Sequence, residues 1–143
     1  MIPIRDATPE DAPALARILG AWVQDTRWMP KLHSPEDDLG FISGLISTGT
    51  VRIAGVVPLG FLARRGADIL QLQIAAGSQR QGLGRALVKD AQGKAAHLSL
   101  WTHQANLSAQ AFWVALGFVE TLRSDGRDSE ERLPDVRFEW SAP

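Results

Sequence analysis

The chain has 143 residues, of which 45% are hydrophobic and 22% charged, and its formal net charge is −1. This length predicts a single domain, residues 1–143, with a hydrophobic core of its own. The near-neutral charge argues against general nucleic-acid binding, the absence of cysteine excludes disulfides and thiol chemistry, and no apolar run approaches the ~18 residues of a membrane span.

The histidines and the N-terminus further limit the class of protein to which the chain can belong. His33, His97 and His103 are widely spaced and show no metal-ligand pattern. The N-terminus has acidic residues where a signal peptide needs a basic segment followed by an apolar one. We therefore expect a cytoplasmic protein that binds neither a metal nor a membrane. Whether the protein forms a homodimer is left open.

Hydrophobic periodicity and turn residues predict an alternating series of strands and helices. Strands are expected over residues 2–7, 50–56, 58–65, 68–76, 97–102, 118–124 and 135–141, and helices over 8–23, 34–49, 83–96 and 106–117. Thr8 and Ser34, each followed by proline, are expected N-caps. Alternation in the fourth strand places Leu70, Leu72 and Ile74 on one face. The order β-α-α-β-β-β-α-β-α-β-β predicts a mixed α/β domain whose central sheet of about seven strands is flanked by about four helices.

The segment SQRQGLGRAL, residues 78–87, follows a predicted strand and opens a predicted helix. It lacks the third glycine of a dinucleotide fingerprint and the Lys-Ser/Thr pair of a P-loop. Backbone N–H groups at a helix N-terminus form an anion site, and Gly82 and Gly84 would let a phosphate approach. Arg80 and Arg85 flank these glycines. On this chemistry alone, an anion-binding loop and a plain glycine-rich turn are both open.

Two motifs favour the anion-binding loop. Gln79, Gly82 and Gly84 match the Q/R-x-x-G-x-G/A pyrophosphate loop of the GNAT superfamily of N-acetyltransferases. NLSAQAFWVALGF, residues 106–118, is similar to the family's N-x-x-A-x-x-x-Y-x-x-x-G-F segment, and the order of elements is the family order. The resemblance implies an acetyl-CoA-dependent N-acetyltransferase, an acyltransferase with acetyl-CoA as cosubstrate. Its acceptor would be a primary amine, on a small molecule or at a protein N-terminus or lysine, that attacks the thioester directly.

The resemblance also implies which residues bind the cosubstrate. The pantetheine arm would lie against the backbone of Leu72, Gln73 and Ile74. The pyrophosphate would be held by the loop residues Arg80, Gln81, Gly82, Leu83, Gly84 and Arg85. Asn106 corresponds to the family asparagine that reaches the cosubstrate near its thiol end.

The family's usual acid and base positions are vacant in this chain. The tyrosine seven residues after the asparagine is replaced by Trp113, and the chain contains no tyrosine. The glutamate that some members carry five residues before the asparagine is replaced by Trp101. A tryptophan can donate a hydrogen bond but cannot exchange a proton at neutral pH. We therefore expect Trp113 to act by shape, closing the cofactor groove over the thioester.

The resemblance implies that residues 24–33, between the first two helices, line the acceptor pocket, and that the loop of the last hairpin folds over it. Candidate bases are His33 and Glu131, with Glu130 and Asp135 nearby, and a relay through water to a distant carboxylate is a further route. The predicted substrate-binding residues are Trp28, Met29, His33 and Trp101. An exposed loop histidine, a solvated acidic loop and core packing of the aromatic residues are the structural alternatives.

The missing tyrosine keeps a second function open. The chain could be an acyl-CoA-binding module without turnover, used for sensing or regulation. Release of the CoA thiol in the presence of amines would distinguish the two functions.

Overall fold

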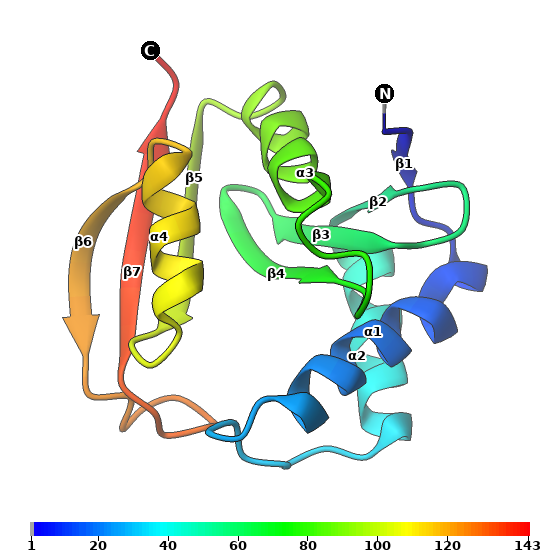
Figure 1. The fold of residues 1–143 in the computed structure, drawn as a ribbon, viewed down its shortest axis with the longest axis horizontal. Helices are drawn as coiled ribbons and strands as arrows, with labels where there is room; N and C mark the ends of the chain where they lie inside the picture. Colours follow the sequence, from blue (N-terminus) through cyan, green and yellow to red (C-terminus); the bar gives the residue numbers. More distant parts are fainter. Residues whose placement is uncertain (1) are drawn as a thin grey trace.

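A mixed seven-stranded sheet organises the computed structural model, which describes residues 2–143 (Figure 1). The strand order is β1-β2-β3-β4-β5-β7-β6. The strands are β1 Ile4–Asp6, β2 Thr50–Ala54, β3 Gly60–Arg65, β4 Asp68–Ile74, β5 His97–His103, β6 Val119–Ser124 and β7 Asp135–Ser141. The helices are α1 Ala12–Asp25, α2 Pro35–Thr48, α3 Leu83–Gln92 and α4 Leu107–Ala115, with a 3-10 turn, η1 Pro9–Asp11, before α1. The predicted fold class and element order are confirmed.

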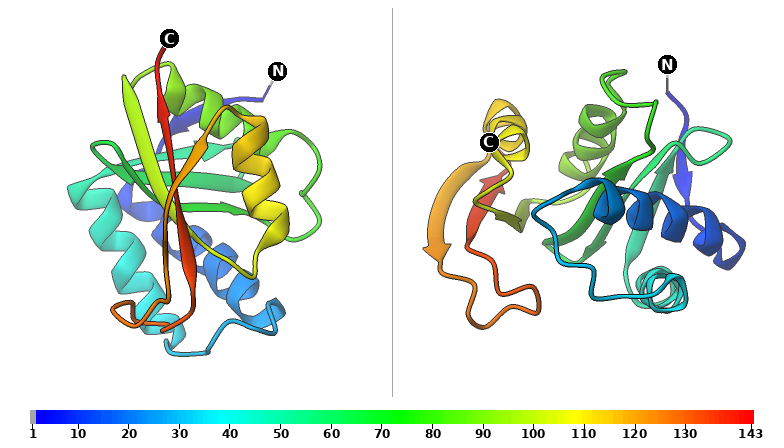
Figure 2. Two further views of the ribbon diagram at one scale, coloured as in Figure 1. Left: turned by 90° about the vertical axis from the view of Figure 1, so that its left-hand side faces the viewer. Right: turned by 60° about the horizontal axis from the view of Figure 1, so that its bottom comes forward.

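Hydrophobic cores lie on both faces of the sheet. On one face α1 and α2 pack on β2 and β3, around Leu15, Ile42 and Phe61. On the other face α3 and α4 pack on a core that includes Leu87 and Phe138. Figure 2 shows α1 and α2 grouped at one end of the molecule and α4 lying along the β5, β6 and β7 strands.

Helix boundaries follow the capping residues closely. Ser34 caps α2 as predicted, because its Oγ accepts from Asp37 N at 3.1 Å while its own N–H donates to the Asp37 carboxylate at 3.0 Å. The first predicted helix instead opens as η1, and α1 begins at Ala12. Helix α3 ends at Gln92 rather than at residue 96: Gly93 is its C-cap, and the next N–H, of Lys94, bonds to the Ala91 carbonyl at 3.0 Å in a tighter turn.

Strand β4 contains a β-bulge in its pairing with β3. Its register with β3 shifts between Ala63 and Arg64, which leaves Leu70 without a partner. Leu72 and Ile74 pack on the core, whereas Leu70 is 39% exposed. A β-bulge of this kind bends the strand and interrupts the two-residue period. Leu70 is thus the residue left out of the β3 pairing, and its side chain does not join the core on which Leu72 and Ile74 pack.

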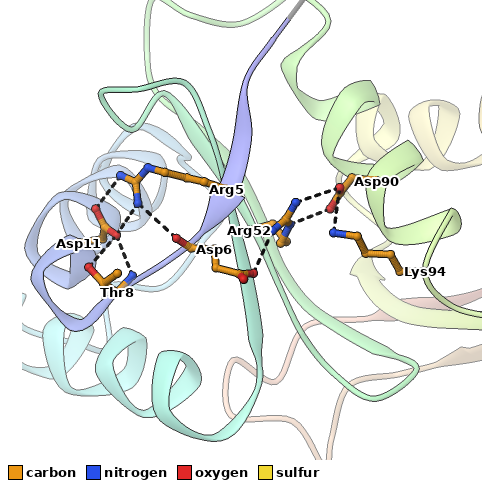
Figure 3. A network of polar contacts seen from close by, with 7 residues as sticks. All are labelled: Arg5, Asp6, Thr8, Asp11, Arg52, Asp90 and Lys94. Atoms are coloured by element: carbon orange, nitrogen blue, oxygen red, sulfur yellow. Dashed lines mark hydrogen bonds and ion pairs between the residues drawn. The ribbon is translucent and has the colours of Figure 1, made fainter.

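An ion-pair network fixes α3 to the sheet (Figure 3). Arg52 of β2 donates from Nε to Asp90 of α3 at 3.0 Å and from Nη1 to Asp6 of β1 at 2.9 Å. Lys94 contacts the same Asp90 carboxylate at 3.3 Å. Because α3 begins at the glycine loop, this network also holds the loop in place relative to the strands.

A second ion pair fixes the start of α1. Arg5 of β1 donates from both terminal nitrogens to the Asp11 carboxylate, at 2.8 and 2.9 Å (Figure 3). The hydrogen bonds from Arg5 lower the pKa of the Asp11 carboxyl from 3.8 to about 2. Because the folded pKa lies below the ordinary value, this stabilisation is present above pH 3.8 and is lost as the pH falls through about 2.

We predict that Asp11→Asn lowers the free energy of unfolding by about 1 kcal/mol at pH 7, a value that allows for solvent screening of the exposed Arg5. Most of the difference from wild type should be lost near pH 2, where about half of the wild-type carboxyls are protonated. Urea denaturation at both pH values measures it. Asp25→Asn, at the exposed end of α1, is the matched control and should change neither value. A deficit of equal size at pH 2 would show that the charge of Asp11 is not responsible.

Candidate functional site

A cleft opens where β4 and β5 part. These parallel strands pair only at Asp68↔Ser99 and Ile69↔Leu100, and the bulge at Leu70 follows directly. Beyond that point, residues 70–74 have no pairing partner on β5. The cleft has a volume of about 1220 Å³ and extends from the glycine loop to the loop between β6 and β7. The right view of Figure 2 shows β6, β7 and α4 standing away from the β1–β4 part of the sheet.

The glycine loop between β4 and α3 has the backbone conformation of an anion nest. Arg80 and Gly82 have φ of 64° and 81°. Alternation between left-handed and right-handed residues turns successive N–H groups toward one side. Gly82 is also the N-cap of α3, whose first-turn N–H groups have no partner within the helix. A Cβ on Gly82 would meet no atom within 4 Å, so no side chain or backbone group covers this glycine on that side.

Gly84 has a different role, in the contact between α3 and α4. A Cβ at this position would lie 3.4 Å from the Phe112 ring, so glycine allows α4 to approach the first turn of α3. Among the other predicted loop residues, the Leu83 side chain is buried in the core, and the side chains of Gln81 and Arg85 are exposed. Of the loop, Gln79, Arg80 and Gly84 line the cleft.

Strand β4 presents both backbone and amide groups to the cleft. The predicted residues Leu72, Gln73 and Ile74 all line it. The side chains of Leu72 and Ile74 pack on the core. Gln73 lies on the opposite face, where its Nε2 donates to Gln71 Oε1 at 3.0 Å. The edge of β4 therefore offers free backbone groups, and its α1-side face offers a pair of amides.

Asn106 links the end of β5 to the start of α4. Its Oδ1 accepts from Ala109 N and Ser108 Oγ, both at 3.2 Å, and so caps α4. Within residues 2–143 its Nδ2 makes no hydrogen bond. Because Asn106 lines the cleft, these amide hydrogens are free to donate to a ligand there.

Trp113 lies in the wall of the cleft and in the core at once. It is only 5% exposed, and its ring meets the rings of Phe112 and Phe118 edge-on, with centroids 5.0 Å apart in both pairs. It nevertheless lines the cleft. A ring packed so firmly can shape the cleft at the position where the family motif has tyrosine.

One part of the cleft lies between α1, the α1–α2 loop and β5. Three of the predicted substrate-binding residues line it: Met29, His33 and Trp101. Trp28 does not line it. The Trp28 ring packs edge-on against Trp22, with centroids 6.0 Å apart, and against His103, with centroids 5.2 Å apart. Trp28 therefore supports the wall from behind, and Trp22 takes its place at the surface of the cleft.

Two contacts fix the α1–α2 loop. Lys31 Nζ donates to the carbonyls of Thr26 and Met29, at 2.7 and 3.0 Å, near the C-terminus of α1. His33 Nε2 contacts Glu130 of the β6–β7 loop, and His33 Nδ1 lies 3.7 Å from Asp37. The side chain of His33 is 50% exposed. The His33–Glu130 contact joins two loops that are far apart in sequence and bridges the outer end of the cleft.

The charges that line the cleft are separated by sign. Four carboxylates line the part of the cleft that is formed by β7 and the β6–β7 loop, from Asp128, Glu130, Glu131 and Asp135. Within the described part of the chain, the one arginine or lysine that lines the cleft is Arg80, at the glycine loop. One end is therefore suited to an anion and the other to a cation.

Trp22, Gln71 and His103 are among the lining residues that were not predicted as site residues. His103 lies one residue beyond the strand predicted from the sequence, at the end of β5. Period-two alternation from Trp101 would have placed both side chains on the same face. Gln71 lies two residues before the predicted site residue Gln73 on the same face of β4, so the same alternation would also have indicated it.

Residues 2–143 hold no cluster of three histidine or carboxylate side chains arranged to bind a metal ion. Each helix described in that range is too short or too polar to cross a membrane.

Comparison with known proteins agrees with this geometry. The model of the Acetyltransferase (GNAT) family matches residues 5–118. No curated protein matches the sequence. Apo YjaB from Escherichia coli is 22% identical, with a TM-score of 0.81 over 100% of this chain and 99% of that one.

Two further solved structures share the fold. YncA from Salmonella typhimurium, solved with its cofactor acetyl-CoA, is 18% identical, with a TM-score of 0.74 over 100% of this chain and 98% of that one. The ribosomal-protein-S18-alanine N-acetyltransferase from Escherichia coli is 21% identical, with a TM-score of 0.77 over 99% and 94% of the two chains.

We predict that Gly82→Ala weakens acetyl-CoA binding at least tenfold. The added methyl group enters the open space before the nest and disfavours the left-handed φ that aims its N–H groups. Gly66→Ala is the matched control, because Gly66 also has positive φ, at 56°, and open space around it, but lies in the β3–β4 turn. Calorimetric titration of both folded variants measures the affinities. Equal affinities for the two variants would exclude the nest as the phosphate site.

Proposed function

Because the chain belongs to the GNAT family of acetyltransferases, we propose that it transfers the acetyl group of acetyl-CoA to a primary amine of a small molecule or peptide. The observation that carries the proposal is the separation of charge along one continuous cleft. The nest and Arg80 suit the phosphates of the cosubstrate. The carboxylates at the outer end, Glu131 among them, suit the ammonium group of an acceptor.

The residues between these ends have separate tasks. The free edge of β4, from Leu72 to Ile74, would bind the amide groups of the pantetheine arm as a further strand would. Acetyl-CoA supplies the thioester when bound. Asn106 Nδ2 would donate a hydrogen bond near the reacting end, where donors aimed at developing negative charge favour the departure of a thiolate. A thiol with a pKa near ~8.5, the reference value for cysteine, is already a fair leaving group.

We predict that the protein releases CoA thiol from acetyl-CoA in the presence of at least one member of an amine panel. The panel contains spermidine, a lysine-bearing peptide and a peptide with a free N-terminal alanine. For the preferred amine, Glu131→Gln should raise KM about fivefold, because one partly screened charge pair with the ammonium group is lost. The affinity for acetyl-CoA should not change.

Asp125→Asn is the control for the acceptor end. Asp125 lies in the same β6–β7 loop but pairs with Arg127 and does not line the cleft, so its kinetics should match wild type. Acetyl-CoA binding without thiol release for any amine would instead support an acyl-CoA-binding module.

We predict that Trp113→Phe costs about tenfold or less in kcat at saturating acetyl-CoA. Phenylalanine keeps most of the ring that packs between Phe112 and Phe118, so the shape of the cleft is largely retained. The buried position makes Trp113→Ala a poor test, since large-to-small core substitutions of this kind cost about 3–5 kcal/mol. A loss near ~10²-fold with binding intact would assign a chemical role to the indole N–H.

A further inference from the structure

One buried nitrogen in the described chain has no hydrogen-bond partner. Among the side-chain nitrogen and oxygen atoms of residues 2–143, this atom is Nδ1 of His103. Buried polar atoms in folded proteins nearly always have partners, and an exception at a functional site is commonly tied to catalysis or ligand binding. The second ring nitrogen, Nε2, also has no hydrogen-bond partner among the described residues, but it is accessible to solvent. Because His103 lines the cleft, Nε2 is open to it.

His103 stands between the two ends of the cleft. It closes β5, three residues before Asn106, and lines the cleft on the same strand as Trp101. Trp28 meets its ring edge-on at 5.2 Å and limits its movement on the side of the α1–α2 loop. The imidazole is therefore fixed beside the place where the acceptor and the thiol end of the cosubstrate would meet.

Charged groups approach His103 from several elements. Asp135 of β7 is its register partner, so the two side chains leave the same face of adjacent strands. The Asp135 carboxylate is occupied by Ser124 Oγ rather than by the imidazole. Further out in the cleft lie Asp128, Glu130 and Glu131 of the β6–β7 loop, His33 of the α1–α2 loop and Arg80 of the glycine loop.

We propose that His103 is the catalytic base that takes the proton from the acceptor ammonium. The inference rests on the proposed acetyl transfer and adds to it the residue that handles the proton. His33 is less suited, because its side chain is half exposed at the outer end of the cleft and its Nε2 already contacts Glu130. His103 is enclosed, has an open Nε2, and faces a carboxylate that supports a transient positive charge.

The step balances without any further reactant. The acceptor enters as R–NH3⁺ and gives one proton to Nε2 of neutral His103. The freed amine nitrogen forms the C–N bond to the acetyl carbonyl carbon, and the C–S bond breaks with the electron pair on sulfur. The second nitrogen proton passes to the thiolate, giving CoA thiol and the amide R–NH–CO–CH3. His103 returns its proton to solvent, so the net reaction releases one H⁺.

The test compares His103→Gln with His97→Gln, using the amine from the panel with the highest kcat/KM. Glutamine keeps a polar side chain of similar length but cannot take a proton. His97 lies on the same strand, bound to Ser141 and Glu139 away from the cleft, so His97→Gln should match wild type. His103→Gln should lose about 10²-fold in kcat/KM at pH 7, with acetyl-CoA affinity unchanged.

The pH profile separates catalysis from packing. A free amine needs no base, so the deficit of His103→Gln should shrink as the pH rises toward the pKa of the acceptor ammonium, near ~10.4 for a lysine-like amine. A deficit of constant size from pH 7 to pH 9.5 would show a structural role and overturn the proposal, as would wild-type activity in the variant.

A second measurement needs no turnover and no variant. In wild-type protein with ¹⁵N-labelled histidine, the three histidines give separate ring signals. Addition of the same amine without acetyl-CoA should shift the His103 ring signals and leave those of His97 in place. Unshifted His103 signals at saturating amine would overturn the proposal. If wild type and His103→Gln acetylate the amine equally well, the role of His103 is refuted and the proposed function stands. If wild type binds acetyl-CoA but acetylates no amine, both the proposed function and this inference are refuted.

Discussion

The structure depends on one interruption of backbone pairing, the parting of β4 from β5. A parallel pair inside a sheet is normally hydrogen-bonded along its length, because unpaired backbone groups shielded from water are costly. Here pairing stops at Ile69↔Leu100, and the bulge at Leu70 bends β4 away at the next residue. The sheet thus keeps an inner edge whose N–H and C=O groups can bind an extended, amide-bearing ligand. A fully paired sheet would have a continuous core and no cleft.

The remaining features of the site follow from where this inner edge ends. The carboxyl end of β4 leads into the glycine loop, of which Gln79, Arg80 and Gly84 line the cleft. The helix that follows, α3, is fixed to β2 through Arg52 and Asp90. The carboxyl end of β5 leads into Asn106 and α4. Parting two parallel strands therefore brings the glycine loop, the Asn106 side chain, the α1–α2 loop and the β6–β7 loop to one opening. The His33–Glu130 contact then joins the α1–α2 and β6–β7 loops across its far end.

Much of this could be predicted from the sequence, because the relevant signals are local. Proline after a capping residue marks the start of α2, and the motif around Gly82 and Gly84 marks a loop whose backbone geometry needs glycine at residue 82. The bulge at Leu70 was not predictable in this way, since it is a property of the pairing between β3 and β4. The exchange of Trp28 for Trp22 in the wall has the same origin: both are bulky residues near the end of α1, and tertiary packing alone decides which faces the cleft.

The two tryptophans at the family's acid and base positions are compatible with acetyl transfer if proton transfer occurs elsewhere in the cleft. The Trp113 ring packs in the core against Phe112 and Phe118. A side chain packed in this way forms a fixed wall of the cleft and does not act as a proton donor. Trp101 fills the β5 position with an apolar ring, which leaves the next residue on the same face, His103, as the titratable group nearest to Asn106 along the strand. Because a thiolate departs with modest help, the more demanding task is to deprotonate the ammonium ion. A neutral imidazole enclosed by Trp28 and faced by Asp135 can do this without the tyrosine that the family motif provides.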